Sequence, residues 1–326
     1  MKTYSDLLRQ FLVYLILISL TAFSCGRVDL ITSAVIGVVT SDSDGSDQGS
    51  QPAPPEELGT VTPVISRSSH DSEPHYSISE DAIVFVSESG GSKDIWKVNR
   101  NGTQLTQLTT SMMSELSPVW SPDGTRIAFA SDSVGNQDIW IMNSNGSGLN
   151  RLTTDTADDA YPFFSSDGTQ IVFASTRSGN SDIWRIPVSG GTPTRLTTDP
   201  ADDFRPRWSP SGGIIAFVSN RNGNRDIWTV PASGGVPERI TEHAAEDDMP
   251  MWSPTGKYIA FTSKRSGNWD IYLKEYGRVI FPLQATLNSG IDTGPSWLSG
   301  EAGLIFISNR NGFLNIMQML FFDLLP

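Results

Sequence analysis

Asp94-Ile95-Trp96 is the first copy of a tripeptide that recurs along this chain at a nearly constant interval. The later copies are Asp138-Ile139-Trp140, Asp182-Ile183-Trp184, Asp226-Ile227-Trp228, Asp270-Ile271-Tyr272 and the divergent Asn315-Ile316-Met317. The steps between them are 44, 44, 44, 44 and 45 residues. A period in the low forties, with several short strands in each unit, is typical of a β-propeller. The interval therefore predicts an all-β fold, a six-bladed β-propeller.

The fourth unit shows how one blade is built. Its expected strands are Phe204–Ser209, the apolar run Ile214–Val218, Asp226–Val230 and Pro237–Thr241. The segments between them contain Gly, Pro, Ser and Asn, which favour turns. We therefore expect four antiparallel strands per blade. An aromatic residue recurs in each first strand and is expected to fill the core between blades. These aromatics are Tyr76, Trp120, Phe164, Trp208, Trp252 and Trp297.

The sixth unit is too short to supply its own outer strand, since the sequence stops at Pro326. Val61–Ser66, which precede the first full unit, match the outer strand Val236–Thr241 of the fourth unit. We therefore expect the N-terminal segment to complete the sixth blade and close the ring, so that no strand edge stays exposed. The predicted propeller spans residues 59–326.

The N-terminal region has the pattern of an export signal. Lys2 and Arg9 precede the apolar run Phe11–Phe23, which is too short to span a bilayer but suits a signal-peptide core. Cys25, the one cysteine of the chain, follows where cleavage is expected. We interpret residues 1–24 as a signal peptide and Cys25 as a lipidation site, the alternative being a secretory signal with an incidental cysteine. Residues 25–58 then form a flexible acidic linker.

The formal net charge is −13 and the sequence pI is about 4.6. Binding to nucleic acid requires a basic patch, so this balance argues against a nucleic-acid partner. It favours cations or a basic face of another protein.

The repeat itself resembles a known family. Each unit reads approximately Pro-x-Trp-Ser-Pro-Asp-Gly, then Ile-Ala-Phe-x-Ser, then Asp-Ile-Trp, and Pro118–Gly124 is a full copy of the first part. This is similar to the propeller repeat of the TolB family, whose namesake is the periplasmic component of the bacterial Tol–Pal envelope system. Related repeats occur in prolyl oligopeptidase-like peptidases. The resemblance covers about residues 59–326. TolB itself carries an α/β domain before its propeller and is not lipid-anchored, so the resemblance implies a TolB-like lipoprotein and not TolB.

A carboxylate stands three residues before the proline of every first strand. These acids are Asp71, Glu115, Asp159, Asp203, Asp247 and Asp292. We expect them in the loops entering the inner strands, near one mouth of the channel. Either they bind a ligand or a divalent cation, or each accepts backbone N–H bonds and braces its loop. An arginine recurs in the loop between the second and third strands, as in Arg177, and is expected to bridge to the Asp five residues later.

The sequence offers little support for catalysis. His70, His75 and His243 are expected in loops and have no metal-binding spacing, and no Gly-x-Ser-x-Gly nucleophile motif is present. We therefore predict a monomeric, non-enzymatic binding or scaffold protein of the bacterial cell envelope. It would have no cofactor beyond a possible divalent cation at the channel mouth. Its partner would be an envelope protein or an extracellular ligand, and a lipid anchor would hold it to the membrane. The alternatives are a carboxylate- or metal-dependent lyase or hydrolase, and a purely structural envelope component.

Overall fold

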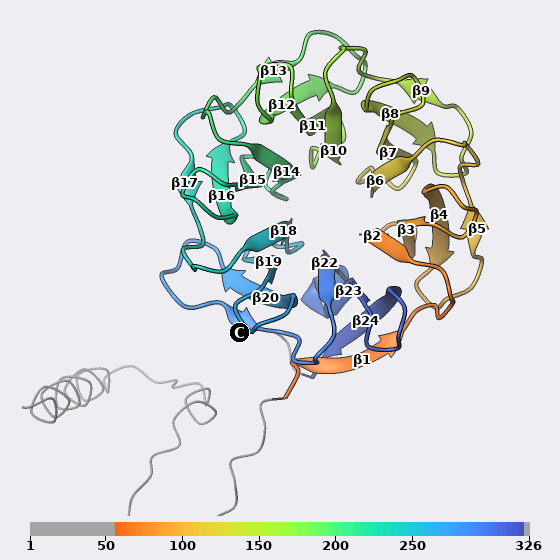
Figure 1. The fold of residues 1–326 in the computed structure, drawn as a ribbon, viewed down its shortest axis with the longest axis vertical. Coiled ribbons are helices and arrows are strands. Elements are labelled where there is room, and N and C mark those ends of the chain that lie inside the picture. The colour runs from red at the N-terminus through yellow and green to blue at the C-terminus, as the bar shows by residue number, and fades with distance from the viewer. Residues whose placement is uncertain (1–55, 323–326) are drawn as a thin grey trace, which may run out of the picture. The chain divides into compact units, whose positions relative to one another are not determined.

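The structure, a computed structural model, describes residues 56–322. The predicted signal peptide, Cys25 and most of the predicted linker lie outside the described residues. The described chain forms six four-stranded antiparallel sheets, arranged as blades in a ring (Figure 1). The prediction of a six-bladed all-β propeller is confirmed.

The blades are built from consecutive strands, with one exception in the sixth. Blade 1 contains β2 (Asp71–Ser77), β3 (Ala82–Ser87), β4 (Asp94–Asn99) and β5 (Thr106–Gln107). Blade 2 contains β6 (Glu115–Trp120), β7 (Arg126–Ser131), β8 (Asp138–Asn143) and β9 (Asn150–Arg151). Blade 3 contains β10 (Asp159–Phe164), β11 (Gln170–Ser175), β12 (Asp182–Pro187) and β13 (Thr194–Arg195). Blade 4 contains β14 (Asp203–Trp208), β15 (Ile214–Ser219), β16 (Asp226–Pro231) and β17 (Glu238–Arg239). Blade 5 contains β18 (Asp247–Trp252), β19 (Tyr258–Ser263), β20 (Asp270–Glu275) and β21 (Leu283–Gln284). Blade 6 contains β22 (Asp292–Trp297), β23 (Gly303–Ser308), β24 (Asn315–Phe321) and β1 (Gly59–Pro63), with a 3-10 turn at Ser299–Glu301.

The sixth blade joins both ends of the described chain. Strand β1 pairs antiparallel with β24, and Val61 lies opposite Met319. Figure 1 shows β1 on the outer edge of the blade that also holds β22, β23 and β24. The predicted closure by an N-terminal strand is therefore confirmed.

The core lies within and between the blades. The middle of each second strand places a phenylalanine at full burial. These are Phe85, Phe129, Phe173, Phe217, Phe261 and Phe306. The first-strand aromatics are buried as well, and Trp120 of blade 2 packs on Val84 and Ile95 of blade 1. The prediction that these aromatics fill the core between blades is confirmed.

Each first strand contains a β-bulge that positions side chains at the centre of the ring. In blade 4 the pairing of β14 with β15 shifts between Phe204 and Arg207. Arg205, inside the bulge, has a positive φ of 53°. The same left-handed conformation recurs at the equivalent residue of every blade. These residues are Glu73, Ser117, Tyr161, Arg205, Met249 and Gly294, with φ between 52° and 64°. A bulge re-aims the side chains around it, and it is common next to functional sites.

Candidate functional site

The six repeated acids are buried within their blades. Asp71, Asp159, Asp203, Asp247 and Asp292 have 0 % relative exposure and Glu115 has 3 %. Asp159 receives two hydrogen bonds from Arg177 Nη2, at 2.8 and 2.7 Å. Arg221 and Arg265 hold Asp203 and Asp247 in the same way, at 2.8 Å. Each of these carboxylates is therefore neutralised inside its own blade.

The arginine of this unit is itself fixed by packing. The Arg177 guanidinium lies over the rings of Phe173 and Trp184, at 5.5 and 5.1 Å, and its Nε donates to Ser175. The bridge expected from Arg177 to the Asp five residues later is wrong. That residue, Asp182, is instead held by Arg195 from the outer strand at 2.6 Å. Arg177 pairs with Asp159 because Asp159 lies directly opposite Ser175 in the sheet. Ser175 is only two residues before Arg177 in the chain.

Blades 1 and 2 contain Ser89 and Ser133 where the other four blades have the arginine, yet the acid of blade 1 is still paired. Arg67, from the segment after β1, donates to Asp71 at 2.7 Å and to Ser87 at 3.0 Å. Its guanidinium lies over Phe85 and Trp96, as Arg177 lies over its own aromatic pair. Sequence reasoning missed Arg67, because it lies outside the repeat.

Blade 2 has no such substitute. Glu115 accepts hydrogen bonds only from hydroxyl groups, namely Thr109 Oγ1 at 3.2 Å and Ser131 Oγ at 3.4 Å. Burial therefore raises the pKa of Glu115, and the hydroxyl groups only partly oppose that shift.

Each of the six acids lies buried within its own blade, where arginine or hydroxyl partners hold it. Residues 56–322 contain no group of three or more His, Cys, Asp or Glu placed to hold a metal ion. Direct binding by the six acids stays an untested prediction, and the geometry gives them the bracing role.

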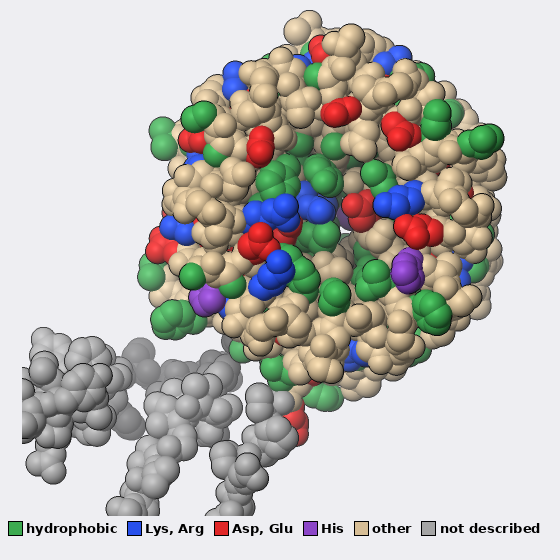
Figure 2. Space-filling model, viewed as in Figure 1, with side chains coloured by type: hydrophobic (Ala, Val, Ile, Leu, Met, Phe, Trp, Pro, Cys, Tyr) green, Lys and Arg blue, Asp and Glu red, His purple; other side chains and the backbone are tan. Residues whose placement is uncertain are grey.

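The side chains that do line the channel come from the bulges. Bulge and following residues of five blades surround one pocket, with Glu73, Ser117, Arg205, Met249 and Gly294 among them. Figure 2 shows the surface hollowed at the centre of the ring, with basic and acidic side chains around the hollow. The backbone conformation repeats from blade to blade, whereas the side chains placed there do not. The left-handed conformation costs a non-glycine residue about 1 kcal/mol.

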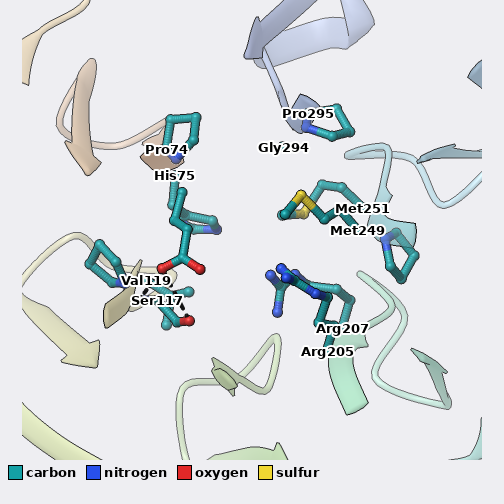
Figure 3. Close-up of a pocket in the computed structure, with 13 residues that line it drawn as sticks. Pro74, His75, Ser117, Val119, Arg205, Arg207, Met249, Met251, Gly294 and Pro295 are labelled. Carbon is teal, nitrogen blue, oxygen red and sulfur yellow. Dashed lines mark hydrogen bonds between the residues drawn. The ribbon is translucent and has the colours of Figure 1, made fainter. Parts of the chain in front are cut away.

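One wall of the channel is basic. Arg205 lies 3.0 Å from Asp248 and over the ring of Tyr161 at 4.8 Å. Asp248 also pairs with Arg225 at 2.9 Å, so two arginines share this carboxylate. Figure 3 shows Arg205 and Arg207 pointing into the same open space, with Ser117 on the facing wall.

Arg207 lies beside Arg205 but has no carboxylate partner within the part of the chain that the structure describes. Its Nη1 donates to the backbone oxygen of Pro206 at 2.9 Å, and its buried Nε has no acceptor. The guanidinium lies over Phe163 at 5.1 Å. Burial, and secondarily the charge of Arg205, lower the pKa of Arg207 to about 10. Arg207 therefore stays charged at neutral pH.

The opposite wall carries Glu73 and His75. Glu73 accepts the Ser117 backbone N–H at 2.6 Å. His75 lies within β2, not in a loop as expected, and its Nδ1 accepts the Trp120 N–H at 3.1 Å. Burial, with Arg207 nearby, lowers the pKa of His75 to about 3, so this imidazole is neutral. Its ring meets Phe163 edge-on at 5.5 Å. The space left between the walls is about 40 Å³, which suits a small group or a few waters.

Sequence reasoning missed this site because it followed what repeats. The channel position lies two residues after each repeated acid and directly before each repeated proline. The channel position is identified by variation instead of repetition, because its residue type changes from unit to unit while the residues around it repeat.

The comparisons with known proteins agree with this architecture. Residues 112–203 match the family model of the TolB beta propeller domain, and residues 178–268 match that of the Tricorn protease N-terminal beta propeller domain. No curated protein matches the chain. The fold and these matches define a six-bladed propeller built from repeats of this type. The TolB-like character of the repeat, which its motif predicted, is confirmed by these matches over residues 112–268.

Solved structures share the fold at low sequence identity. A putative TolB from Agrobacterium tumefaciens is 22% identical, with a TM-score of 0.62 over 79% of this chain and 92% of that one. TolB from Acinetobacter baumannii is 20% identical, with a TM-score of 0.56 over 78% of this chain and 64% of that one. An oligogalacturonate lyase in complex with manganese is 13% identical, with a TM-score of 0.59 over 81% of this chain and 93% of that one. TolB proteins and a lyase thus share this scaffold, so the fold alone does not assign a function.

Within residues 56–322, no helix is long and apolar enough to cross a membrane.

Proposed function

We propose that this chain is an exported binding propeller whose central channel receives part of a partner in the bacterial cell envelope. One observation carries the proposal: scaffold positions repeat from blade to blade, whereas the channel positions differ in all six blades. A residue needed only for the fold is copied with the repeat. Glu73, Tyr161, Arg205 and Met249 occupy equivalent places yet share neither charge nor shape.

The backbone at these positions supports a binding role. Four charged or bulky residues with φ of 52° to 54° occupy positions where glycine would be unstrained. Strain kept at non-glycine residues is common at functional sites, where it orients a side chain. In this proposal the strain presents individual side chains to the partner, and the six repeated acids only hold the blades.

The cellular setting of the proposal comes from the N-terminal sequence. A signal peptide at residues 1–24 would export the chain, and a lipid on Cys25 would hold it at a membrane. Residues 26–55 would give the propeller reach from that surface, since Glu57 and Leu58 already contact the propeller. Similarity to TolB propellers is consistent with a protein partner.

Site-specific photo-crosslinking tests the proposal. A photoreactive amino acid replaces Met249 in the channel in one variant and Ser211, on an exposed turn outside the channel, in a matched variant. After irradiation of native envelopes, we expect a discrete, stoichiometric adduct from the Met249 position only. Equal labelling from both positions, or none from Met249, would contradict the proposal and favour a purely structural component.

An enzyme is the second candidate, favoured by the fold shared with oligogalacturonate lyase and by the arginines of the channel. An anionic sugar acid would be the substrate class under this alternative. Incubating the protein with oligogalacturonate, with and without Mn²⁺, tests it. Formation of unsaturated sugar products by the wild-type protein and not by Arg207→Gln would support the enzyme. Intact substrate under both conditions would exclude this activity.

A further inference from the structure

We infer that the channel contains a carboxylate-binding subsite formed by Arg207 and Arg205. This inference deepens the proposed function, and it rests on that proposal only for the location of the site. The ligand chemistry is a carboxylate group, supplied either by a small organic acid or by the free end of a protein segment.

The charge balance of the channel is the first argument. The charged side chains that line the pocket are Arg205, Arg207 and Glu73. Asp248 is shared by Arg205 and Arg225 at 3.0 and 2.9 Å. Glu73 forms no ion pair with Arg207, so Arg207 is the guanidinium of the pocket that has no carboxylate partner among the described residues. A buried charge without a partner is costly, so its retention points to a ligand that supplies the missing anion.

The direction of the guanidinium groups is the second argument. The Arg207 Nε is buried and has no acceptor, and one Nη is occupied by the Pro206 carbonyl. Figure 3 shows both arginines aimed at the same open space. A planar guanidinium offers donors in a fork that matches the two oxygens of a carboxylate. The hydroxyl of Ser117 faces the same pocket and adds a polar group to its lining.

Glu73 limits what can enter. Its carboxylate accepts the Ser117 N–H and hydroxyl at 2.6 and 3.3 Å, which hold it on the wall facing the arginines. A single carboxylate against Arg207 is attracted, whereas a second anionic group reaching Glu73 is repelled. The small free space also excludes bulky anions. The site therefore selects a slender ligand that ends in one carboxylate.

An NMR titration tests the inference on the propeller in its exported form. Arginine Nε–Hε resonances are followed while sodium acetate is added, with sodium chloride at equal ionic strength as the reference. We expect saturable shifts of the Arg205 and Arg207 resonances with acetate only. Arg207→Gln should weaken the acetate response at Arg205 at least about tenfold. Arg278→Gln, which removes an exposed arginine outside the channel, should bind acetate like the wild type.

Two further probes identify the source of the carboxylate. Tetraglycine with a free carboxylate and tetraglycine amide differ only at the C-terminus. Shifts with tetraglycine but not with its amide indicate a chain end, and shifts with acetate alone indicate a small acid. No saturable shift with either acetate or tetraglycine, or unchanged binding by Arg207→Gln, would overturn the inference.

Stability measurements separate this role from a structural one. Since Arg207→Gln removes a buried charge that has no partner, its melting temperature should equal or exceed that of the wild type. A lower melting temperature together with unchanged acetate binding would make Arg207 part of the fold instead. Acetate binding without a Met249 crosslink would preserve this inference and refute the partner protein. A Met249 crosslink without acetate binding would support the partner protein and refute this inference.

Discussion

At the scale of single residues, the repeated acids and the arginines that meet them explain why the blades are uniform. Asp159→Asn removes the charge of a fully buried carboxylate and leaves Arg177, only 14 % exposed, without its main partner. Breaking a buried ion pair from one side costs about 3 kcal/mol. We therefore expect chemical denaturation to show a loss of about that size.

Glu238→Gln is the matched control for this experiment, because it makes the same charge change on an exposed side chain. It should leave stability nearly unchanged. Near-native stability of Asp159→Asn combined with loss of a ligand would show that this acid binds and does not brace.

Glu115 gives a prediction that depends on pH. Burial raises its folded-state pKa above the unfolded value, so the charged form is disfavoured in the fold. The cost is absent well below the unfolded-state pKa of about 4.5, where the group is protonated in both states; it grows as the pH rises above that value and is complete above the folded-state pKa. Glu115→Gln should therefore stabilise the protein more at pH 8 than at pH 4. Urea melts of both proteins at the two pH values would show this, and a pH-independent difference would count against it.

At the scale of elements, β1 is the strand whose loss should matter most. A chain starting at Arg67 lacks β1 but keeps the Arg67–Asp71 pair, and it leaves the edge of β24 unpaired. We expect a lower melting temperature and self-association through that edge. A chain starting at Glu56 keeps β1 and is the control. Equal melting temperatures for the two chains would refute closure as a source of stability.

The elements also show what a single sequence can and cannot reveal. Asp-Ile-Trp, the turns and the apolar second strands are local patterns, and they predicted the strands and the closing pair. The partner of Asp71 could not be found this way, because Arg67 reaches it from outside the repeat. The channel site could not be found this way either. The left-handed bulge at Arg205 is a property of the backbone, and the spacing of the prolines does not predict it. Repetition drew attention to six acids, and the structure shows that each of them has partners within the fold.

At the scale of the whole molecule, the lipid anchor that we propose on Cys25 gives a prediction about partitioning. A lipidated protein should partition into the detergent phase, and its N-terminal peptide should carry acyl mass. Each buried methylene contributes about 0.8 kcal/mol, so several chains bind stably where one does not. Cys25→Ala should move the protein to the aqueous phase or leave it unprocessed. Recovery of the wild-type protein in the aqueous phase, without acyl mass, would rule the anchor out.

The pairing of β1 with β24 also sets the order in which the blades can be completed during synthesis. Residues 59–63 are synthesised before any complete blade, whereas their partners at 317–321 follow all the other strands of the ring. Five blades can form as the polypeptide emerges, while the first strand waits without a neighbour. The ring can therefore close only after β24 has been synthesised, and a chain that stops before β24 leaves the sixth blade open. If the protein is tethered through its N-terminus, β1 would be the first strand of the propeller to experience a force directed toward the membrane.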